Sequence, residues 1–282
     1  MKSLRYLWMP ALFILVALLS LVHAQRLAAQ SNSSISGTGS ISGNGTIPSS
    51  AVYLPLVANH AAPTPAPTYA AIPIAGAPID RPAHIHGDLN LSLRSYVSTT
   101  AELTLVDIEG HTDVNAPQLA DIFTPARLPQ FSAVYQVHDW DWGCGSDGCR
   151  GAALTDPPVT LLEMTTNVGE VIAIPSRDPQ IYGGGYKAMV LYAEATRITL
   201  VYTRDDTPAH GYVVHFEDFA VEPALLALYQ QLNEAGRQQL PALHNGEKIG
   251  AATGATIKVA VRDTGKFMDP RSRKDWWVGF VQ

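Results

Sequence analysis

Three clusters of side chains in this sequence have residue types and spacing suited to chemistry, and the densest is His84-Ile85-His86-Gly87-Asp88. Imidazole nitrogen and carboxylate oxygen both coordinate zinc at about 2 Å. On an extended segment His84, His86 and Asp88 share one face, because alternate residues of a strand point to the same side. The segment predicts either part of a zinc site or a histidine-rich turn at the entrance to the domain.

The second cluster is the run from His138 to Trp142. In a strand, Trp140 and Trp142 share one face, and Asp139 and Asp141 share the other. Indole rings beside carboxylates can bind a sugar, because the rings stack on its apolar face and the acids accept hydrogen bonds from its hydroxyl groups. Two alternatives stay open: core packing of the tryptophans, and glycoside hydrolysis by the aspartates, which lie about 7 Å apart along a strand.

The third cluster surrounds His215, which follows Gly211-Tyr212 inside an apolar run. A histidine in such a position is typical of a hydrogen-bonded interior residue, and the alternative is a metal ligand or general base. The sequence contains no G-x-S-x-G elbow, no H-E-x-x-H helix and no P-loop. Serine hydrolase, zincin and nucleotide-driven activities therefore lack their usual motifs.

Short β-branched and aromatic runs separated by Gly, Pro, Asp and Asn predict a mainly β fold, an antiparallel sandwich or small barrel. One amphipathic helix is expected from Pro223 to Gly236, because apolar residues recur there at helical spacing. The folded domain is expected over 70–282, with a sub-boundary near residue 155. The predicted strands are Leu103–Ile108, Phe131–Val137, Val159–Met164, Glu170–Ile174, Ala188–Tyr192, Arg197–Tyr202, Gly211–Phe216 and Thr256–Val261.

The N-terminal region predicts export. A short basic start precedes an apolar run over 7–22 and a small-residue exit, which indicates a signal peptide over 1–24 and a secreted, extracellular protein. Residues 25–69, rich in Ser, Gly and Pro, predict a flexible linker. Because the expected cleavage site has no Cys, a lipid anchor is not indicated. The YLPLV block over 53–57 resembles a linker segment of uncharacterised secreted bacterial proteins.

Cysteine content and charge narrow the function classes further. Cys144 and Cys149 are the two cysteines of the chain, and in an oxidising compartment they predict a local disulfide. The chain has 19 basic and 25 acidic residues, so it has no general attraction for nucleic acid. After signal cleavage no membrane partner is expected either.

The C-terminal segment resembles the closing strands of lysostaphin-type (LytM-like) peptidoglycan endopeptidases. The resemblance rests on Asn245 to Gly254 and on Thr256 to Pro270, and the family's H-x-x-x-D motif is matched in spacing by His84 and Asp88. This resemblance implies a related small barrel that has lost its catalytic zinc site, and the alternative is a generic antiparallel hairpin with a Gly-rich turn. Thr256 and Lys258 stand where the family has its H-x-H ligands, and a protonated ammonium group cannot coordinate zinc.

The combined expectation is a secreted, non-catalytic module that binds cell-wall or other extracellular polysaccharide through Trp140, Trp142, Asp139 and Asp141, and needs no cofactor. The first alternative is a zinc-dependent peptidoglycan hydrolase of degenerate lysostaphin type, in which His84, Asp88 and His215 serve the metal and His86 or His138 completes the site. The second alternative is a structural surface or adhesion protein.

Overall fold

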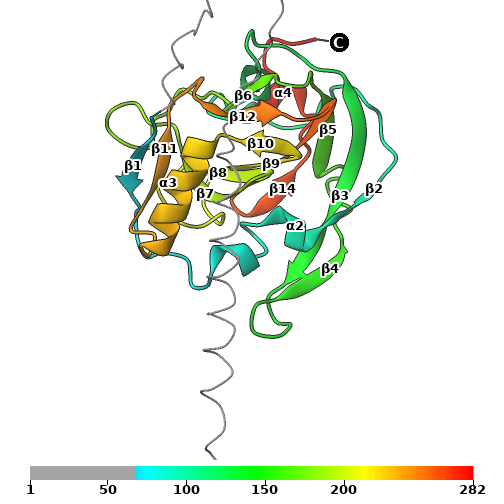
Figure 1. Cartoon of the computed structure of the whole chain (residues 1–282). Coiled ribbons are helices and arrows are strands. Elements are labelled where there is room, and N and C mark those ends of the chain that lie inside the picture. Colours follow the sequence, from blue (N-terminus) through cyan, green and yellow to red (C-terminus); the bar gives the residue numbers. More distant parts are fainter. Residues whose placement is uncertain (1–67, 282) are drawn as a thin grey trace, which may run out of the picture. The chain divides into compact units, whose positions relative to one another are not determined.

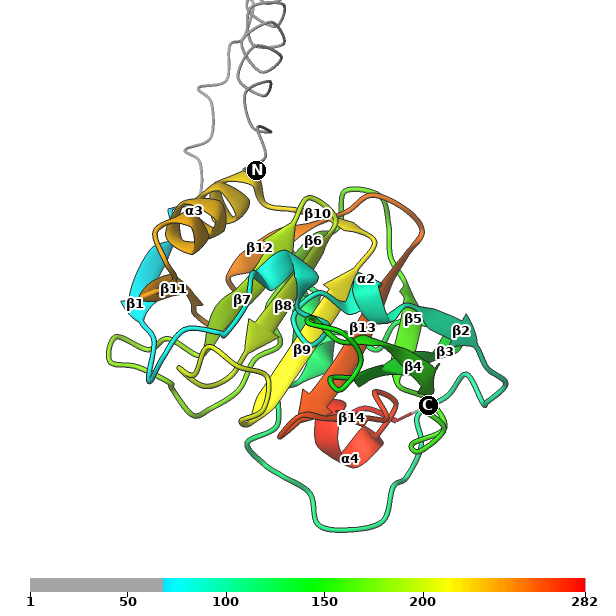
Figure 2. The same cartoon turned by 90° about the horizontal axis from the view of Figure 1, so that it is seen from below.

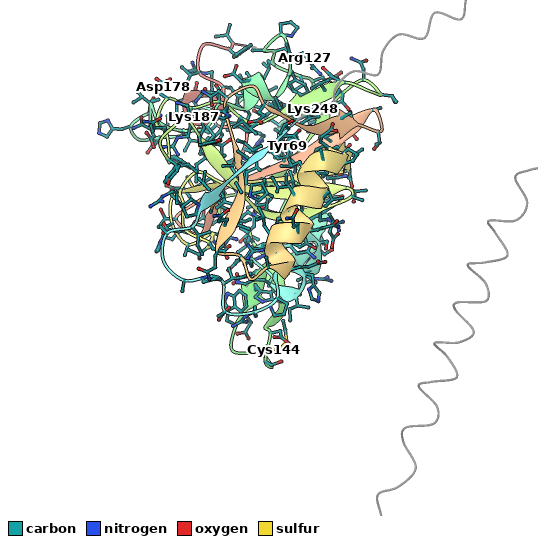
Figure 3. The ribbon with its side chains drawn as sticks, turned by 60° about the vertical axis from the view of Figure 1, so that its left-hand side comes forward. Tyr69, Arg127, Cys144, Asp178, Lys187 and Lys248 are labelled. Atoms are coloured by element: carbon teal, nitrogen blue, oxygen red, sulfur yellow. A yellow bond between two sulfur atoms is a disulfide. The ribbon has the colours of Figure 1, made fainter. Side chains whose placement is uncertain are left out.

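The computed structural model describes residues 68–281, which lie in one compact unit. The predicted signal peptide and almost all of the predicted linker lie outside these residues. The described part is built from two antiparallel sheets and a few helices (Figure 1). The first strand begins at Ala70, where the domain was expected to start, and the preceding Tyr69 already donates a hydrogen bond from its hydroxyl group to the carbonyl of Lys248 at 2.7 Å (Figure 3).

The large sheet has eleven strands. Nine follow the order β1-β11-β7-β8-β9-β13-β5-β3-β2, while β14 pairs with β13 and β4 pairs with β3. Because this path runs from β1 at one edge to β2 at the other, the sheet is open and does not close into a barrel. Its strands are β1 (Ala70–Pro73), β2 (Tyr96–Ser98), β3 (Phe131–Asp141), β4 (Cys149–Ala153), β5 (Leu161–Thr165), β7 (Ala188–Glu194), β8 (Arg197–Val201), β9 (Tyr212–Glu217), β11 (Gln239–Leu243), β13 (Thr256–Asp263) and β14 (Lys266–Met268).

A small second sheet and several helices accompany the large sheet (Figure 2). The small sheet has the order β10-β12-β6. Helix α3 packs against β7 and β11 at one end of the large sheet. The remaining elements are β6 (Val171–Ala173), β10 (Phe219–Val221), β12 (Lys248–Ala252), the 3-10 helices η1 (Ala83–Ile85) and η2 (Leu119–Ile122), and the helices α2 (Leu91–Arg94), α3 (Pro223–Glu234) and α4 (Arg273–Trp276).

Alternation along the central strands explains which residues are buried. In β13, Val259 and Val261 join the main core, while Ala260 between them joins a smaller cluster on the opposite face with Leu91, Val137, Leu161 and Phe267. Both faces of this strand are therefore covered, and its run of apolar residues fits a strand buried on two sides.

The predicted mainly β, antiparallel architecture with one amphipathic helix is confirmed, in the form of an open sandwich. The helix starts at Pro223 and buries Leu225 and Tyr229, one turn apart. The predicted strand at Leu103–Ile108 is wrong, because only Val106 in this range forms a bridge, with Ser272. The large sheet also crosses residue 155 without a break, since β3 and β5 on either side of it are paired directly.

Candidate functional site

Trp140 in β3 is a packing residue. Its indole lies so close to two glycines that an added Cβ would stand 2.4 Å from the ring at Gly87 and 2.1 Å from Nε1 at Gly148. The same Nε1 donates to the carbonyl of Asp147 at 3.2 Å. The half-buried ring therefore fastens the segment around Gly87 to the loop between β3 and β4.

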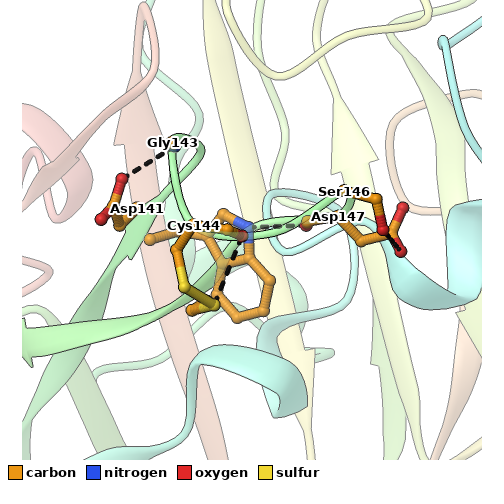
Figure 4. Close-up of a disulfide and its surroundings, with 7 residues drawn as sticks. Asp141, Gly143, Cys144, Ser146 and Asp147 are labelled. Atoms are coloured by element: carbon orange, nitrogen blue, oxygen red, sulfur yellow. Dashed lines mark hydrogen bonds between the residues drawn. A yellow bond between two sulfur atoms is a disulfide. The ribbon is translucent and has the colours of Figure 1, made fainter.

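The loop between β3 and β4 is closed by the predicted disulfide, which joins Cys144 and Cys149 (Figure 4). Asp141 accepts a hydrogen bond from the backbone N–H of Gly143 at 2.8 Å, and the hydroxyl group of Ser146 donates to Asp147 at 2.8 Å. These short-range bonds fix the loop that carries Trp142. The carboxylate of Asp141 is thereby used in turn formation.

Trp142 is the tryptophan of this pair that solvent reaches, with 39% of its surface exposed. The Arg81 guanidinium lies 4.5 Å from its ring centre, and His86 meets it edge-on at 5.0 Å. Trp140 and Trp142 are inclined by 68°, so they do not form the flat two-ring platform expected from strand alternation. The chain turns directly after Asp141, where β3 ends, and this turn redirects Trp142.

A pocket of about 410 Å³ opens beside Trp142, and we call it the Trp142 pocket. Three carboxylates, one guanidinium and one imidazole reach its wall, together with short apolar residues. This mixture of one aromatic ring and several hydrogen-bonding groups is typical of sites for small polar ligands. The lining residues are Ala77, Pro78, Ile79, Asp80, Arg81, His86, Asp88, Trp142, Asp206 and Thr207.

One wall of the Trp142 pocket is anchored by a buried ion pair. Asp206 accepts hydrogen bonds from Nε and Nη2 of Arg237 at 2.8 and 2.6 Å, and it also accepts from the backbone N–H of Ile79 at 3.1 Å. Arg237 follows α3 and also donates to the hydroxyl group of Tyr229. The loop that presents Arg81 is therefore tied to the C-terminal end of α3, which fixes the geometry of the pocket before a ligand arrives.

Elsewhere in the wall of the Trp142 pocket, Asp88 is held between two buried arginines. Nη2 of Arg262 lies 2.9 Å from its carboxylate, and Nη2 of Arg94 donates to the same oxygen. Although burial alone would raise it, the two guanidinium groups hold the pKa of Asp88 below its usual value. The carboxylate is ionised, and its contacts with both arginines fasten the segment before α2 to β13.

A second pocket, of about 350 Å³, lies on the other side of this cluster, and we call it the arginine pocket. Arg94 and Arg262 line it, so the two pockets meet at the ion pairs of Asp88. Asp139 stands at its rim, with 65% of its side chain exposed, 3.7 Å from Nη1 of Arg94. The lining residues are Arg94, Asp139, Leu154, Asp156, Pro157, Arg262, Gly265, Lys266, Phe267 and Met268.

His84, His86 and Asp88 do not share a face, because the segment is not extended. Ala83–Ile85 forms the 3-10 helix η1, in which residues two apart point in different directions. His84 is exposed, whereas His86 is buried and accepts a hydrogen bond on Nδ1 from the backbone N–H of Asp88 at 3.2 Å. Burial lowers the pKa of His86, which favours the neutral ring.

His215 lies in the interior of β9, with 1% of its surface exposed. Its Nδ1 lies 2.9 Å from the hydroxyl group of Thr199, and its ring stacks on Phe267. No group of three or more His, Cys, Asp or Glu side chains within residues 68–281 is arranged to hold a metal ion. His138 was also suggested as a ligand, and its Nδ1 lies within hydrogen-bond distance of the carbonyl oxygen of Gly151, at 2.9 Å.

Lys258, which replaces a metal ligand in the resemblance to lysostaphin-type enzymes, belongs to a row of charges across the large sheet. Its ammonium group pairs with Asp218 and with Glu163, which lies 3.3 Å away. These pairs raise the pKa of Lys258 and keep it charged. The row crosses five neighbouring strands and consists of Glu194, Arg197, Glu217, Lys258 and Glu163.

Sequence reasoning identified Trp142 and Asp88 but missed the three arginines that define the pockets. Arg81 comes from a loop before η1, Arg94 ends α2 and Arg262 lies near the end of β13. One signal was available: Arg262 is a charged residue in an otherwise apolar strand, and a charge in such a position requires a buried partner.

Within the described part of the chain, the structure contains no helix long and apolar enough to cross a membrane. No protein-family model, curated protein or solved structure matches the chain. The function is therefore inferred from the two pockets and from the residues that line them.

Proposed function

We propose that this domain is a secreted, non-catalytic module that binds an extracellular or cell-wall polysaccharide, holding one sugar unit in the Trp142 pocket. The observation that carries the proposal is the partly exposed Trp142 ring at the wall of a pocket whose polar groups include three carboxylates, a guanidinium and an imidazole. Sugars are bound in this way elsewhere, by an aromatic ring against C–H groups and by charged groups against hydroxyls.

Arg81 supports this function because one nitrogen of its guanidinium group has no hydrogen-bond acceptor among the described residues. Its Nε and Nη2 donate to Asp80 at 2.9 and 2.8 Å, while Nη1 donates to no other residue in the described range. Stacking of the guanidinium on Trp142 also holds the ring in one orientation. A hydroxyl group entering the pocket would therefore find an ordered ring and a free N–H donor, which reduces the entropy lost on binding.

A binding role is favoured over zinc-dependent hydrolysis by how the suggested ligands are used. Asp88 is neutralised by two guanidinium groups, and His215 is sealed in the interior against Thr199 and Phe267. To coordinate zinc, Asp88 would have to leave both arginines, and separating such a buried pair costs several kcal/mol. The disulfide and the predicted signal peptide are consistent with a protein that functions outside the cytoplasm.

Retention on insoluble polymers tests the proposal. The protein is mixed with peptidoglycan, chitin or cellulose and pelleted, and the bound fraction is compared with that of Trp142→Ala and of a matched control, Tyr182→Ala. Tyr182 is also 39% exposed and also has an arginine above its ring, Arg204 at 5.0 Å. We expect at least one polymer to retain the protein and the Trp142 variant to lose about tenfold in affinity, consistent with the loss of a ring contact.

Two outcomes would overturn this function. If none of the polymers retains the protein, or if the two variants behave alike, the Trp142 pocket is not a sugar site and a structural or adhesion role gains support. If the purified protein, after zinc supplementation and dialysis, keeps close to one zinc per chain, the hydrolase replaces the binding module. We expect less than about 0.1 zinc per chain, because the metal would need both free imidazole and free carboxylate ligands.

A further inference from the structure

The wall shared by the two pockets carries more positive than negative charge. Arg94 and Arg262 are each 4% exposed, and both contact the carboxylate of Asp88, whose side chain is 16% exposed. Their other hydrogen bonds are to neutral carbonyl oxygens: Arg94 donates to those of Gly87 and His138, and Arg262 to those of Gly265 and Asp88. Two buried cations thus share one half-buried anion, and the excess positive charge favours the binding of a further anion.

The surroundings of the arginine pocket strengthen this preference. His215 and the two guanidinium groups all contact the ring of Phe267. Burial, reinforced by the charges of Arg262 and Arg94, lowers the pKa of His215 well below the ordinary value, so the imidazole is neutral. Leu154 and Phe267 supply an apolar wall. A charge–charge interaction is stronger next to such groups than in open water, because the local dielectric constant is lower.

The rim of the arginine pocket contains both signs of charge. Lys266 on β14 is exposed and forms no ion pair with any of the residues described. Asp139, 3.7 Å from Arg94, competes with an incoming anion, but most of its side chain is in water and its charge is screened. Asp156 is likewise exposed. The two rim acids should therefore weaken anion binding without preventing it.

We propose that the arginine pocket is a binding site for an anionic group, a carboxylate or a phosphate, and that the polymer recognised by this domain is an acidic glycan. The second half rests on the proposed function of the Trp142 pocket, since the two pockets adjoin at Asp88. On this proposal, when one sugar is seated beside Trp142, a charged unit of the same polymer occupies the arginine pocket against Arg94, Arg262 and Lys266.

The first experiment measures binding of inorganic phosphate and of acetate to the whole protein by calorimetry or by NMR. Lys266→Ala is expected to weaken binding of the anion at least threefold, and Asp139→Asn to strengthen it at least threefold, because the two charges act with opposite sign. The matched controls are Lys187→Ala and Asp178→Asn, a neighbouring pair labelled in Figure 3 in which the Lys187 ammonium donates to the Asp178 carbonyl. These controls should leave affinity unchanged.

The comparison of phosphate with acetate decides which anion fits the pocket. The site does not exist if neither anion binds at millimolar concentration, or if the Lys266 and Asp139 variants shift affinity no more than their controls. All four substitutions are on the surface, so each variant is expected to fold, and a circular dichroism spectrum checks this for each one.

The second experiment separates this inference from the function on which it rests. Retention on a uronic-acid polymer is compared with retention on its neutral counterpart, for the wild type and for Lys266→Ala. The acidic-glycan inference is supported if the wild type prefers the acidic polymer and Lys266→Ala abolishes this preference. Equal retention on both polymers leaves the binding module in place and overturns the inference. Phosphate binding without retention on any polymer supports the anion site and overturns the sugar function.

Discussion

Nδ1 of His215 lies 2.9 Å from Oγ1 of Thr199, and this contact determines which tautomer the buried imidazole adopts. The Thr199 hydroxyl group donates its proton to the carbonyl oxygen of Leu89 at 2.6 Å, so its oxygen accepts from His215. The proton of the neutral ring is therefore on Nδ1. Nε2 is left as a buried acceptor with no partner among the described residues.

This arrangement predicts a loss of stability in mild acid. The folded state resists protonation of His215 because the ring is buried beside Arg262 and Arg94, so its pKa lies well below 6.5, whereas the unfolded chain accepts the proton near pH 6.5. At His215 the unfolded state then binds more protons, so the contribution of this residue to the free energy of unfolding falls as the pH drops below about 6.5, by at most about 1.4 kcal/mol per pH unit. Asp88, which also faces the ring, opposes this effect only in part.

Urea unfolding at several values between pH 8 and pH 5 measures this effect. The difference in the free energy of unfolding between wild type and His215→Asn, which has no titrating ring, should shrink in the direction of lower pH, whereas His84→Asn, which removes an exposed histidine, should leave the slope of the wild type unchanged. A wild-type slope that is the same in His215→Asn would show that His215 is protonated in the folded state, contrary to the tautomer deduced from Thr199.

Glu217 predicts a pH effect of the opposite sign. Burial raises its pKa to about 7, although the ion pair with Arg197 at 2.9 Å acts against the shift. Between pH 4.5 and 7 the folded state retains a proton that the unfolded chain has lost, so the contribution of Glu217 to stability is present below pH 4.5 and is lost as the pH rises through 7. The loss is about 3 kcal/mol for a shift of this size.

Glu217→Gln and Glu163→Gln test this prediction as a pair, since the difference from wild type isolates each group from His215. The first should remove a contribution that falls with rising pH. Glu163 accepts a hydrogen bond from Tyr135 at 2.7 Å and pairs with Lys258, and its pKa is lowered, so the second should remove one that is lost with falling pH. If both substitutions change the pH dependence of the free energy of unfolding in the same direction, the pKa of Glu217 is not raised by burial.

Asp88→Asn is expected to destabilise the fold by about 3 to 5 kcal/mol, because it leaves the buried guanidinium groups of Arg94 and Arg262 without their shared anion. Asp107→Asn is the matched control: Asp107 pairs with Arg273 but is 73% exposed, and its loss should cost less than about 1 kcal/mol. Chemical unfolding measures both. Equal effects would mean that Asp88 is not the centre of a buried cluster.

The central strands could be predicted from the sequence because each is an apolar run bounded by turn residues, as for β7, β9 and β13. Strands β11 and β12 escaped because Pro241 and Gly250 interrupt their patterns. Pro241 lies opposite Ala71, in the part of β11 that pairs with β1. Gly250 is required because a Cβ there would lie 2.1 Å from the carbonyl oxygen of Ala220. Both positions depend on neighbours that are distant in the sequence.

The candidate site was less predictable than the fold. Asp88 pairs with Arg262, which lies 174 positions later in the chain, and no local sequence pattern connects the two residues. The shared face expected for His84 and His86 on an extended segment is absent, because Pro82 precedes a 3-10 turn, which agrees with the alternative of a histidine-rich turn. Trp142 was predicted as part of a two-ring platform or as a core residue, and its actual orientation depends on where β3 ends and on the cysteine loop.

The close packing of Trp140 against Gly148 predicts that Gly148→Ala will be more damaging than Gly145→Ala in the same loop. Both glycines have positive φ, +82° and +69°, so both substitutions introduce backbone strain of about 1 to 2 kcal/mol. At Gly145 an added Cβ meets no atom within 4 Å, whereas at Gly148 it would stand 2.1 Å from Nε1 of Trp140. The loop or the ring must then move.

The excess cost of Gly148→Ala should be about 1 to 3 kcal/mol, the usual range for overpacking, and it should be accompanied by a red shift of tryptophan fluorescence as the indole becomes more exposed. A double-mutant cycle with Trp140→Ala isolates the contact, because the excess should largely vanish when the ring is absent. If Gly145→Ala and Gly148→Ala cost the same, Trp140 does not fasten this loop. Trp140 would then be free to act beside Trp142 in ligand binding, and the separation of roles between the two rings would fail.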